Sequence, residues 1–192
     1  MKTRESGMPG EPVWSAFFDA EAVLRTLGLR PNSGDVVDFG CGYGTFAIPA
    51  AGITRGTVHA FDIDPVMVSA TQARAEVEGR ANVVAGRRDL MAEGTGLPND
   101  SIGYAMLFNI LHCEQPGVLL REAWRVLAPG GALAVMHWNF DPSTPRGPSM
   151  SIRPRPEQCR AWALEAGFQA QKPQPVDLRP YHYGLLFRRP TR

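Results

Sequence analysis

Apolar and polar residues follow one another along the chain in a pattern that predicts a mixed α/β fold. Short apolar runs alternate with segments in which apolar residues recur at helical spacing. Strands joined by crossover helices in a largely parallel sheet produce such a pattern. The runs expected to form strands are 35–40, 57–63, 82–86, 102–111, 132–138 and 182–187. All but the last are expected to be buried core strands.

Proline marks the expected start of each helix. Pro12, Pro65, Pro116 and Pro156 each precede apolar residues at helical spacing. Proline is favoured at the first helical position because its missing N–H would have no partner there. Gly167 is expected to end the last helix, because glycine readily adopts the left-handed conformation of a helix C-terminus.

Three segments stand out from the regular pattern. Residues 127–131, "LAPGG", predict a turn that leads from a helix into the fifth strand. Residues 139–156 contain five prolines and predict an irregular loop, which in a compact domain is often functional. Residues 1–30 predict an N-terminal helix whose aromatic side chains form either a core-facing stripe or a lid over a bound ligand. The chain, residues 1–192, is read as one domain.

Composition excludes several classes of protein. No uninterrupted apolar run reaches the roughly 18 residues of a membrane span, and the first residues lack the apolar centre of a secretory signal. A cytoplasmic protein is expected. The cysteines are Cys41, Cys113 and Cys159, an odd number without CxxC spacing, so neither a disulfide framework nor a metal site is predicted.

The net charge of +1 hides an asymmetry between the two parts of the chain. Residues 146–192 hold nine Lys or Arg and three Asp or Glu, whereas residues 1–145 hold eleven and sixteen. A basic segment could attract an anionic substrate or a nucleic acid. These arginines are scattered, so a solvated surface is the preferred interpretation and nucleic acid is not an expected partner.

The stretch "VVDFGCGYGTF" predicts a ligand-binding turn. Gly40, Gly42 and Gly44 follow an apolar strand and precede a helix, so a ligand could lie against bare backbone there. The dinucleotide pattern GxGxxG is not met, because Thr45 stands at its third glycine position. A pyrophosphate site is therefore disfavoured.

Two aspartates indicate which further chemical groups the predicted ligand carries. Asp62 ends the second strand, where a carboxylate can accept both hydroxyls of a ribose. Asp38 precedes the glycines and suits a ligand that carries an ammonium group. Both could simply cap turns at strand ends, but with the glycines they point to an amino-acid nucleoside.

At these motifs the chain resembles the class I S-adenosylmethionine-dependent methyltransferases, and more narrowly the small type 11 or ubiquinone-biosynthesis-like kind. The motifs are "VVDFGCGYG", "FDID", "RRDL", "GYAMLFNILH" and "LREAWRVLAPGGALAVMHW", in this order. The resemblance implies a Rossmann-like, seven-stranded, mostly parallel sheet with helices on both faces and an antiparallel last strand. It also implies S-adenosylmethionine as cofactor.

The resemblance assigns roles to the motif residues. The glycines would line the methionine part, Asp38 would lie near its ammonium and Asp62 would hold the ribose. The remaining cofactor contacts it implies are Ile63, Asp89 and Leu90 around the adenine, and Asn109 facing the methionine part. Two further acids, Glu93 and Asp100, lie near Asp89 in the sequence and compete with it for this role.

Other candidates lie where ligands bind in open α/β sheets, beyond the carboxyl ends of the parallel strands. His112 and His137 are candidates for taking a proton, although a hydrogen-bonded structural histidine is the commoner case. The candidates for contacting a substrate are Trp138, Tyr181 and Arg146. Arg146, Arg153 and Arg155 could bind an anionic group or merely solvate the loop.

The function expected from these residues is in-line transfer of a methyl group to a small-molecule acceptor. A general base would be needed only if the acceptor bears a proton in the transition state. Two alternatives stay open at this point: a protein that binds the cofactor without catalysis, and a nicotinamide-dependent oxidoreductase.

Overall fold

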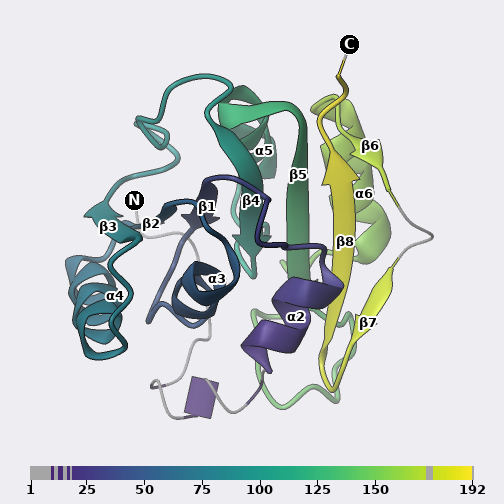
Figure 1. Ribbon diagram of the computed structural model, residues 1–192. Coiled ribbons are helices and arrows are strands. Elements are labelled where there is room, and N and C mark those ends of the chain that lie inside the picture. Colours follow the sequence, from purple (N-terminus) through teal and green to yellow (C-terminus); the bar gives the residue numbers. More distant parts are fainter. Residues whose placement is uncertain (1–9, 11–12, 15–16, 18, 172–174, 192) are drawn as a thin grey trace.

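The computed structural model describes residues 10, 13, 14, 17, 19–171 and 175–191 (Figure 1). Its sheet consists of β1 (Val36–Phe39), β2 (Val58–Asp62), β3 (Val83–Arg87), β4 (Ile102–Phe108), β5 (Leu127–Trp138), β6 (Gln169–Ala170), β7 (Val176–Leu178) and β8 (His182–Arg188). The described helices are α2 (Ala20–Thr26), α3 (Ala47–Ile53), α4 (Pro65–Val77), α5 (Pro116–Val126) and α6 (Pro156–Glu165).

The strand order is β3-β2-β1-β4-β5-β8-β6, and β7 also pairs with β8. Strands β1 to β5 are parallel, and β8 runs antiparallel to β5. The predicted α/β fold with an antiparallel last strand is confirmed. The sheet has eight strands rather than the expected seven, because β6 and β7 pair with successive parts of β8 along the same edge. Between them lies Pro175, which has no N–H to donate to a ladder.

Helices cover both faces of the sheet, with α2, α3 and α4 on one side and α5 and α6 on the other (Figure 1). Each face has its own buried cluster. Leu24 of α2 and Ala47 of α3 belong to one cluster, while Leu120 of α5 and Cys159 of α6 belong to the other. Burial on both faces explains why the central strands are apolar runs without alternation.

The predicted helix starts agree with the structure where it is described. Pro65, Pro116 and Pro156 are each the first residue of a helix, and Gly167 follows α6 with a φ of 99°. The start expected at Pro12 lies outside the described residues. Helix α2 begins at Ala20, where the carboxylate of Asp19 accepts a hydrogen bond from the N–H of Ala22.

Two predicted boundaries are wrong. The strand expected over 102–111 ends at Phe108, because Asn109 has a φ of 53° and leaves the extended conformation. Residues 127–131, expected to form a turn, belong to β5. Their pairing with β4 is irregular, because Leu127 pairs with Ile102 but Ala132 pairs with Tyr104. Between these two pairs β5 therefore contains more residues than β4. The loop expected over 139–156 is irregular up to the start of α6.

Candidate functional site

The turn between β1 and α3 is built on positive backbone angles. The φ values are 79° at Gly40, 54° at Gly42 and 72° at Gly44, a conformation that other residues adopt only with strain. A β-carbon on Gly40 would lie 2.8 Å from the Cδ1 atom of Ile110. The glycines therefore allow both the turn and the close approach of its neighbours.

Asp62 ties the end of β2 to this turn. Its carboxylate accepts hydrogen bonds from the N–H of Gly42 at 3.0 Å and from the N–H of Asp64 at 2.9 Å. The hydroxyl of Thr71, on α4, donates to the carbonyl of Gly42 at 2.9 Å. Thr71 belongs to no motif, so sequence reasoning missed it. A carboxylate has about four acceptor sites, so Asp62 can also accept ribose hydroxyls.

Cys41 lies within the turn and is buried. Its Sγ atom lies 3.6 Å from the hydroxyl oxygen of Thr71. Burial, and next the charge of Asp38, raises the pKa of the thiol well above its ordinary value. A thiol of this kind is unreactive, which agrees with the expectation that Cys41 packs rather than attacks.

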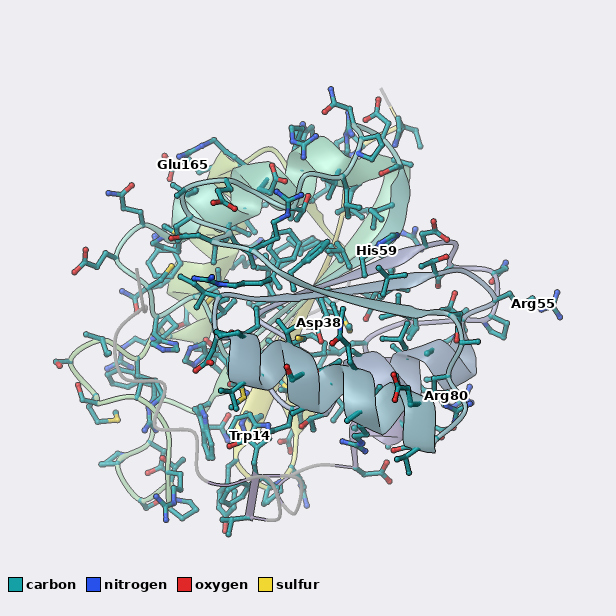
Figure 2. All side chains as sticks on the ribbon, turned by 90° about the vertical axis from the view of Figure 1, so that its left-hand side faces the viewer. Trp14, Asp38, Arg55, His59, Arg80 and Glu165 are labelled. Carbon is teal, nitrogen blue, oxygen red and sulfur yellow. The ribbon has the colours of Figure 1, made fainter. Side chains whose placement is uncertain are left out.

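Asp38 is a buried carboxylate on β1 with 2% of its surface exposed. Figure 2 shows it in the interior, between the sheet and a layer of helices. Burial, and next the negative charge of Asp62, raises the pKa of this carboxyl to about 7. No described residue offers it a cation or a hydrogen bond, so its environment suits a positively charged ligand group.

Asn109 directly follows β4 and has both side-chain polar atoms unsatisfied. Its N–H donates to the carbonyl of Met136 at 2.8 Å, which fixes the backbone. The amide oxygen and nitrogen of its side chain are buried and have no partner among the described residues. Buried polar groups in native proteins are nearly always hydrogen-bonded, so a bound polar ligand is the expected partner.

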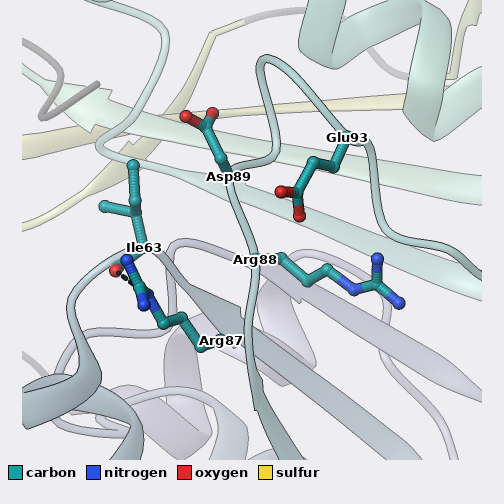
Figure 3. A pocket seen from close by; sticks show the side chains of 5 residues that line it. All are labelled: Ile63, Arg87, Arg88, Asp89 and Glu93. Atoms are coloured by element: carbon teal, nitrogen blue, oxygen red, sulfur yellow. Dashed lines mark hydrogen bonds between the residues drawn. The ribbon is translucent and has the colours of Figure 1, made fainter.

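A hollow of about 360 Å³ lies between the loops that follow β2 and β3 (Figure 3). The residues that line it are Ile63, Arg87, Arg88, Asp89 and Glu93. Ile63 and Asp89, both expected around an adenine, are thus brought together, and Leu90 is buried beside them. Two other acids could take the role expected of Asp89 at the adenine. Glu93 also lines the hollow, whereas Asp100 forms an ion pair with Arg189.

The candidate proton acceptors His112 and His137 are neighbours in the structure. Both are buried, and Nδ1 of His112 lies 3.3 Å from Nε2 of His137. Burial, followed by the charges of His112, His182 and Arg153, lowers the pKa of His137 well below its ordinary value. Burial and then Arg153 lower the pKa of His182 to about 3. The imidazoles of His137 and His182 are therefore neutral at physiological pH.

Trp138, at the end of β5, is buried under other aromatic rings. Its ring centroid lies 5.4 Å from that of Phe17, 6.2 Å from Trp14 and 6.3 Å from Tyr181. The imidazole of His182 lies at 4.2 Å. The described aromatic residues of the N-terminal segment thus cover the end of β5. Whether that segment acts as a lid stays a prediction.

Arg153 organises the loop between β5 and α6. Its guanidinium is buried and, among the described residues, donates its hydrogen bonds to groups of that loop. The acceptors are the carbonyls of Asn139, Asp141, Arg146 and Pro148 and the hydroxyl of Thr144. The structure therefore separates three arginines that look alike in the sequence: Arg153 is internal, Arg146 is exposed, and Arg155 lies over the ring of Phe140 at 3.7 Å.

Comparison with known proteins agrees with this site. The family described as "Methyltransferase domain" matches residues 36–131, which contain the glycine turn, Asp62, Asp89 and Asn109. The chain belongs to this family, the class I S-adenosylmethionine-dependent methyltransferases, so the predicted family, enzyme class and cofactor are confirmed. A nicotinamide-dependent oxidoreductase is no longer an alternative.

Individual relatives show how far the likeness extends. The ribosomal protein L11 methyltransferase of Bacillus cytotoxicus is 30% identical over 109 residues, which are 56% of this chain and 33% of the relative. That of Bacillus cereus strain AH820 is 29% identical over the same share of each chain. The chain thus spans a third of the length of the curated relatives that it matches.

Solved structures share the fold at lower identity. An S-adenosylmethionine-dependent methyltransferase from Aquifex aeolicus has a TM-score of 0.82 at 23% identity, covering 93% of both chains. A type 11 methyltransferase from Sulfolobus solfataricus has a TM-score of 0.65 at 23% identity, covering 83% of this chain and 86% of its own. The [4+2]-cyclase SpnF has a TM-score of 0.73 at 18% identity, covering 88% and 81%. The fold alone therefore does not fix the reaction.

The residues of the site fit S-adenosylmethionine. A buried carboxylate (Asp38), an unsatisfied buried amide (Asn109) and a glycine turn without β-carbons lie where its methionine part is expected. Among the described residues no helix is long and apolar enough to span a membrane. A cytoplasmic location stays a prediction.

Proposed function

We propose that this protein transfers the methyl group of S-adenosylmethionine to a small-molecule acceptor. We choose a small acceptor because aromatic side chains cover the carboxyl end of β5. Trp14 and Phe17 pack on Trp138, and the loop held by Arg153 runs beside them. A protein acceptor would need an open surface there, whereas a small molecule can be enclosed.

The cofactor side of the site has a role for each motif residue. Asp38 pairs with the ammonium group, Asn109 hydrogen-bonds the methionine part, and Asp62 accepts from the ribose hydroxyls. Ile63 and Asp89 contact the adenine in the hollow between their loops. When bound, S-adenosylmethionine supplies an activated methyl group on a sulfonium, so the chemistry demands little further activation.

The residues on the acceptor side of the site mainly position the acceptor molecule and shield it from water. Holding two reactants in attack geometry can lower a barrier by roughly 7–11 kcal/mol. The rings of Trp138 and Tyr181 bound this region and exclude water from it. Nδ1 of His112 lies 3.3 Å from Nε2 of His137, so these two are the candidates for receiving the proton of a hydroxyl or thiol acceptor, and the pKa of His137, which burial lowers, makes this residue a weak base. Arg146, being exposed, would contact only an acceptor that reaches the surface of the loop.

A protein acceptor is the second candidate. It is favoured by the likeness to ribosomal protein L11 methyltransferases, although the shared part is a third of those proteins. A cofactor-binding protein without catalysis is the third.

A methyl-transfer screen separates these functions. The purified protein is incubated with S-adenosylmethionine labelled in the methyl group, and label is followed into phenols, thiols, amines, quinones, ribosomal protein L11 and RNA. The expected result is transfer to one class of small molecule, abolished in Asp62→Ala and retained in the matched control Asp35→Ala. Transfer to L11 alone would establish the second candidate. Cofactor binding without any transfer would establish the third.

A further inference from the structure

The segment 88–101 joins β3 to β4 and carries the acids of the hollow. Asp89 and Glu93 both line the hollow (Figure 3), and the N–H of Glu93 donates to the carbonyl of Asp89 at 2.8 Å, which closes the turn between them. The segment starts at a fixed point, because the N–H of Arg88 donates to the carbonyl of Asp62 at 2.9 Å. What holds the segment beyond Glu93 therefore decides how well the two acids keep their place.

Glu122, on α5, holds the segment two residues beyond Glu93. Its Oε1 atom accepts hydrogen bonds from the N–H of Thr95 at 2.7 Å and from the hydroxyl of Thr95 at 2.6 Å. Thr95 is 1% exposed, and the side chain of Glu122 is 13% exposed. Hydrogen bonds to a charged group are stronger than neutral ones, and more so away from water. Glu122 thus fixes both the backbone and the side chain of Thr95.

Arg125 keeps the carboxylate of Glu122 in this orientation. Its Nη2 atom donates to Oε1 at 2.7 Å and its Nε atom to Oε2 at 2.8 Å, a bidentate pair that fixes the plane of the carboxylate. Its Nη1 atom donates to the carbonyl of Leu97 at 2.9 Å and to the side-chain oxygen of Asn99 at 2.6 Å. Burial acts to raise the pKa of Glu122, but hydrogen bonds from Arg125 and then from Thr95 lower it to about 2, so the carboxylate is charged at neutral pH.

Apolar packing holds the segment on either side of this point but not at it. Leu90 belongs to the buried cluster beneath α5 and α6, and Leu97 packs against that cluster, whereas residues 92–96 add no side chain to it. Gly94 has a φ of 63°, and a β-carbon there would lie 2.8 Å from Oε1 of Glu122, so the backbone passes directly beside the carboxylate. This part of the segment therefore depends on hydrogen bonds to the carboxylate rather than on packing.

We propose that Glu122 is a positioning residue for the adenine end of the cofactor. Through Thr95 it holds the segment that carries Asp89 and Glu93, so that an acid of this segment accepts a hydrogen bond from the 6-amino group of adenine. The inference rests on the proposed function, which puts the adenine in the hollow. It goes beyond that function because it assigns selectivity for adenine to a residue that does not itself line the hollow.

Calorimetry with two ligands tests the proposal. The ligands are S-adenosylhomocysteine and its 6-deamino analogue, in which hydrogen replaces the 6-amino group, and the ratio of their affinities measures selectivity for adenine. Glu122→Gln removes the charge of the carboxylate, and Thr95→Val removes the hydroxyl. Thr95→Ser keeps both donors, and Glu78→Gln removes an acid that pairs with Arg74 at the end of α4. Binding of the deamino analogue shows that a variant is folded, and Thr95→Val decides if Glu122→Gln does not fold.

Wild type should prefer S-adenosylhomocysteine by about ten-fold, the effect of one hydrogen bond to a charged group. The preference should fall to about two-fold or less in Glu122→Gln and Thr95→Val, and stay near the wild-type value in Thr95→Ser and Glu78→Gln. A merely structural role would weaken both ligands alike, so an unchanged ratio in Glu122→Gln and Thr95→Val overturns the inference. Wild type without a preference also overturns it, and in either case the cofactor assignment survives. No binding of S-adenosylhomocysteine to the folded wild type overturns both.

Discussion

The carboxyl of Asp38 is unfavourable for the fold of the free protein. Its pKa is about 7 in the folded state and close to 4 in an unfolded chain. Stability is therefore highest with the proton bound, below the unfolded pKa, and falls as pH rises towards 7. A buried, binding-ready carboxylate is the kind of local destabilisation expected at functional sites.

Asp38→Asn should consequently stabilise the free protein at high pH. A shift of one pKa unit corresponds to about 1.4 kcal/mol. The advantage of the variant in free energy of unfolding should grow by roughly 2–4 kcal/mol between pH 4.5 and pH 8. Urea unfolding at both pH values measures it, and a difference that does not change with pH would contradict the account.

Replacing Gly40 by alanine should affect both stability and cofactor binding. Gly40→Ala adds a β-carbon 2.8 Å from Ile110 to a backbone with a φ of 79°. The matched control is Gly79→Ala, where φ is 63° and no atom lies within 4 Å of the new carbon. Both should lose about 1–2 kcal/mol of stability from the left-handed backbone, but only Gly40→Ala should weaken binding of S-adenosylhomocysteine, by at least ten-fold. Equal affinities would remove Gly40 from the site.

Among the elements, the loop between β5 and α6 depends most on one side chain. Arg153→Gln removes a buried cation whose donors are satisfied by loop carbonyls, and buried acceptors left unpaired cost about 1–3 kcal/mol each. Amides in residues 139–152 should exchange with deuterium at least ten-fold faster, while affinity for S-adenosylhomocysteine stays within about two-fold. Arg146→Gln, at an exposed side chain of the same loop, is the control and should leave exchange unchanged.

Element boundaries were less predictable than the elements themselves. The sequence placed β1, β2, β3 and β8 within two residues of their observed ends. It placed the end of β4 too late, although asparagine adopts a positive φ more readily than most other non-glycine residues, and Asn109 has a φ of 53°. It also missed β6 and β7, whose two and three residues carry too little pattern to be seen.

For the whole molecule, motif spacing was enough to predict which residues of the candidate cofactor site lie close together, but not which residues gather at the end of β5. Asp38, Asp62 and the glycines come from adjoining parallel strands, so their order in the chain already implies their proximity. Trp14, Trp138 and Tyr181 come together from distant parts of the chain, and His112 meets His137 through the pairing of β4 with β5. Such long-range contacts depend on packing, which a single sequence does not display.

The position of β8 has a consequence for how the chain is assembled. Strand β8 pairs with β5 along its whole length, yet β5 precedes it in the sequence by the entire segment that contains α6, β6 and β7. While the chain emerges from a ribosome, the apolar edge of β5 must stay unpaired until β8 has been made. Open strand edges are where newly made chains associate wrongly. Production in cells should therefore be limited by aggregation of incomplete chains, and slower translation or a chaperone that covers this edge should raise the yield of folded protein.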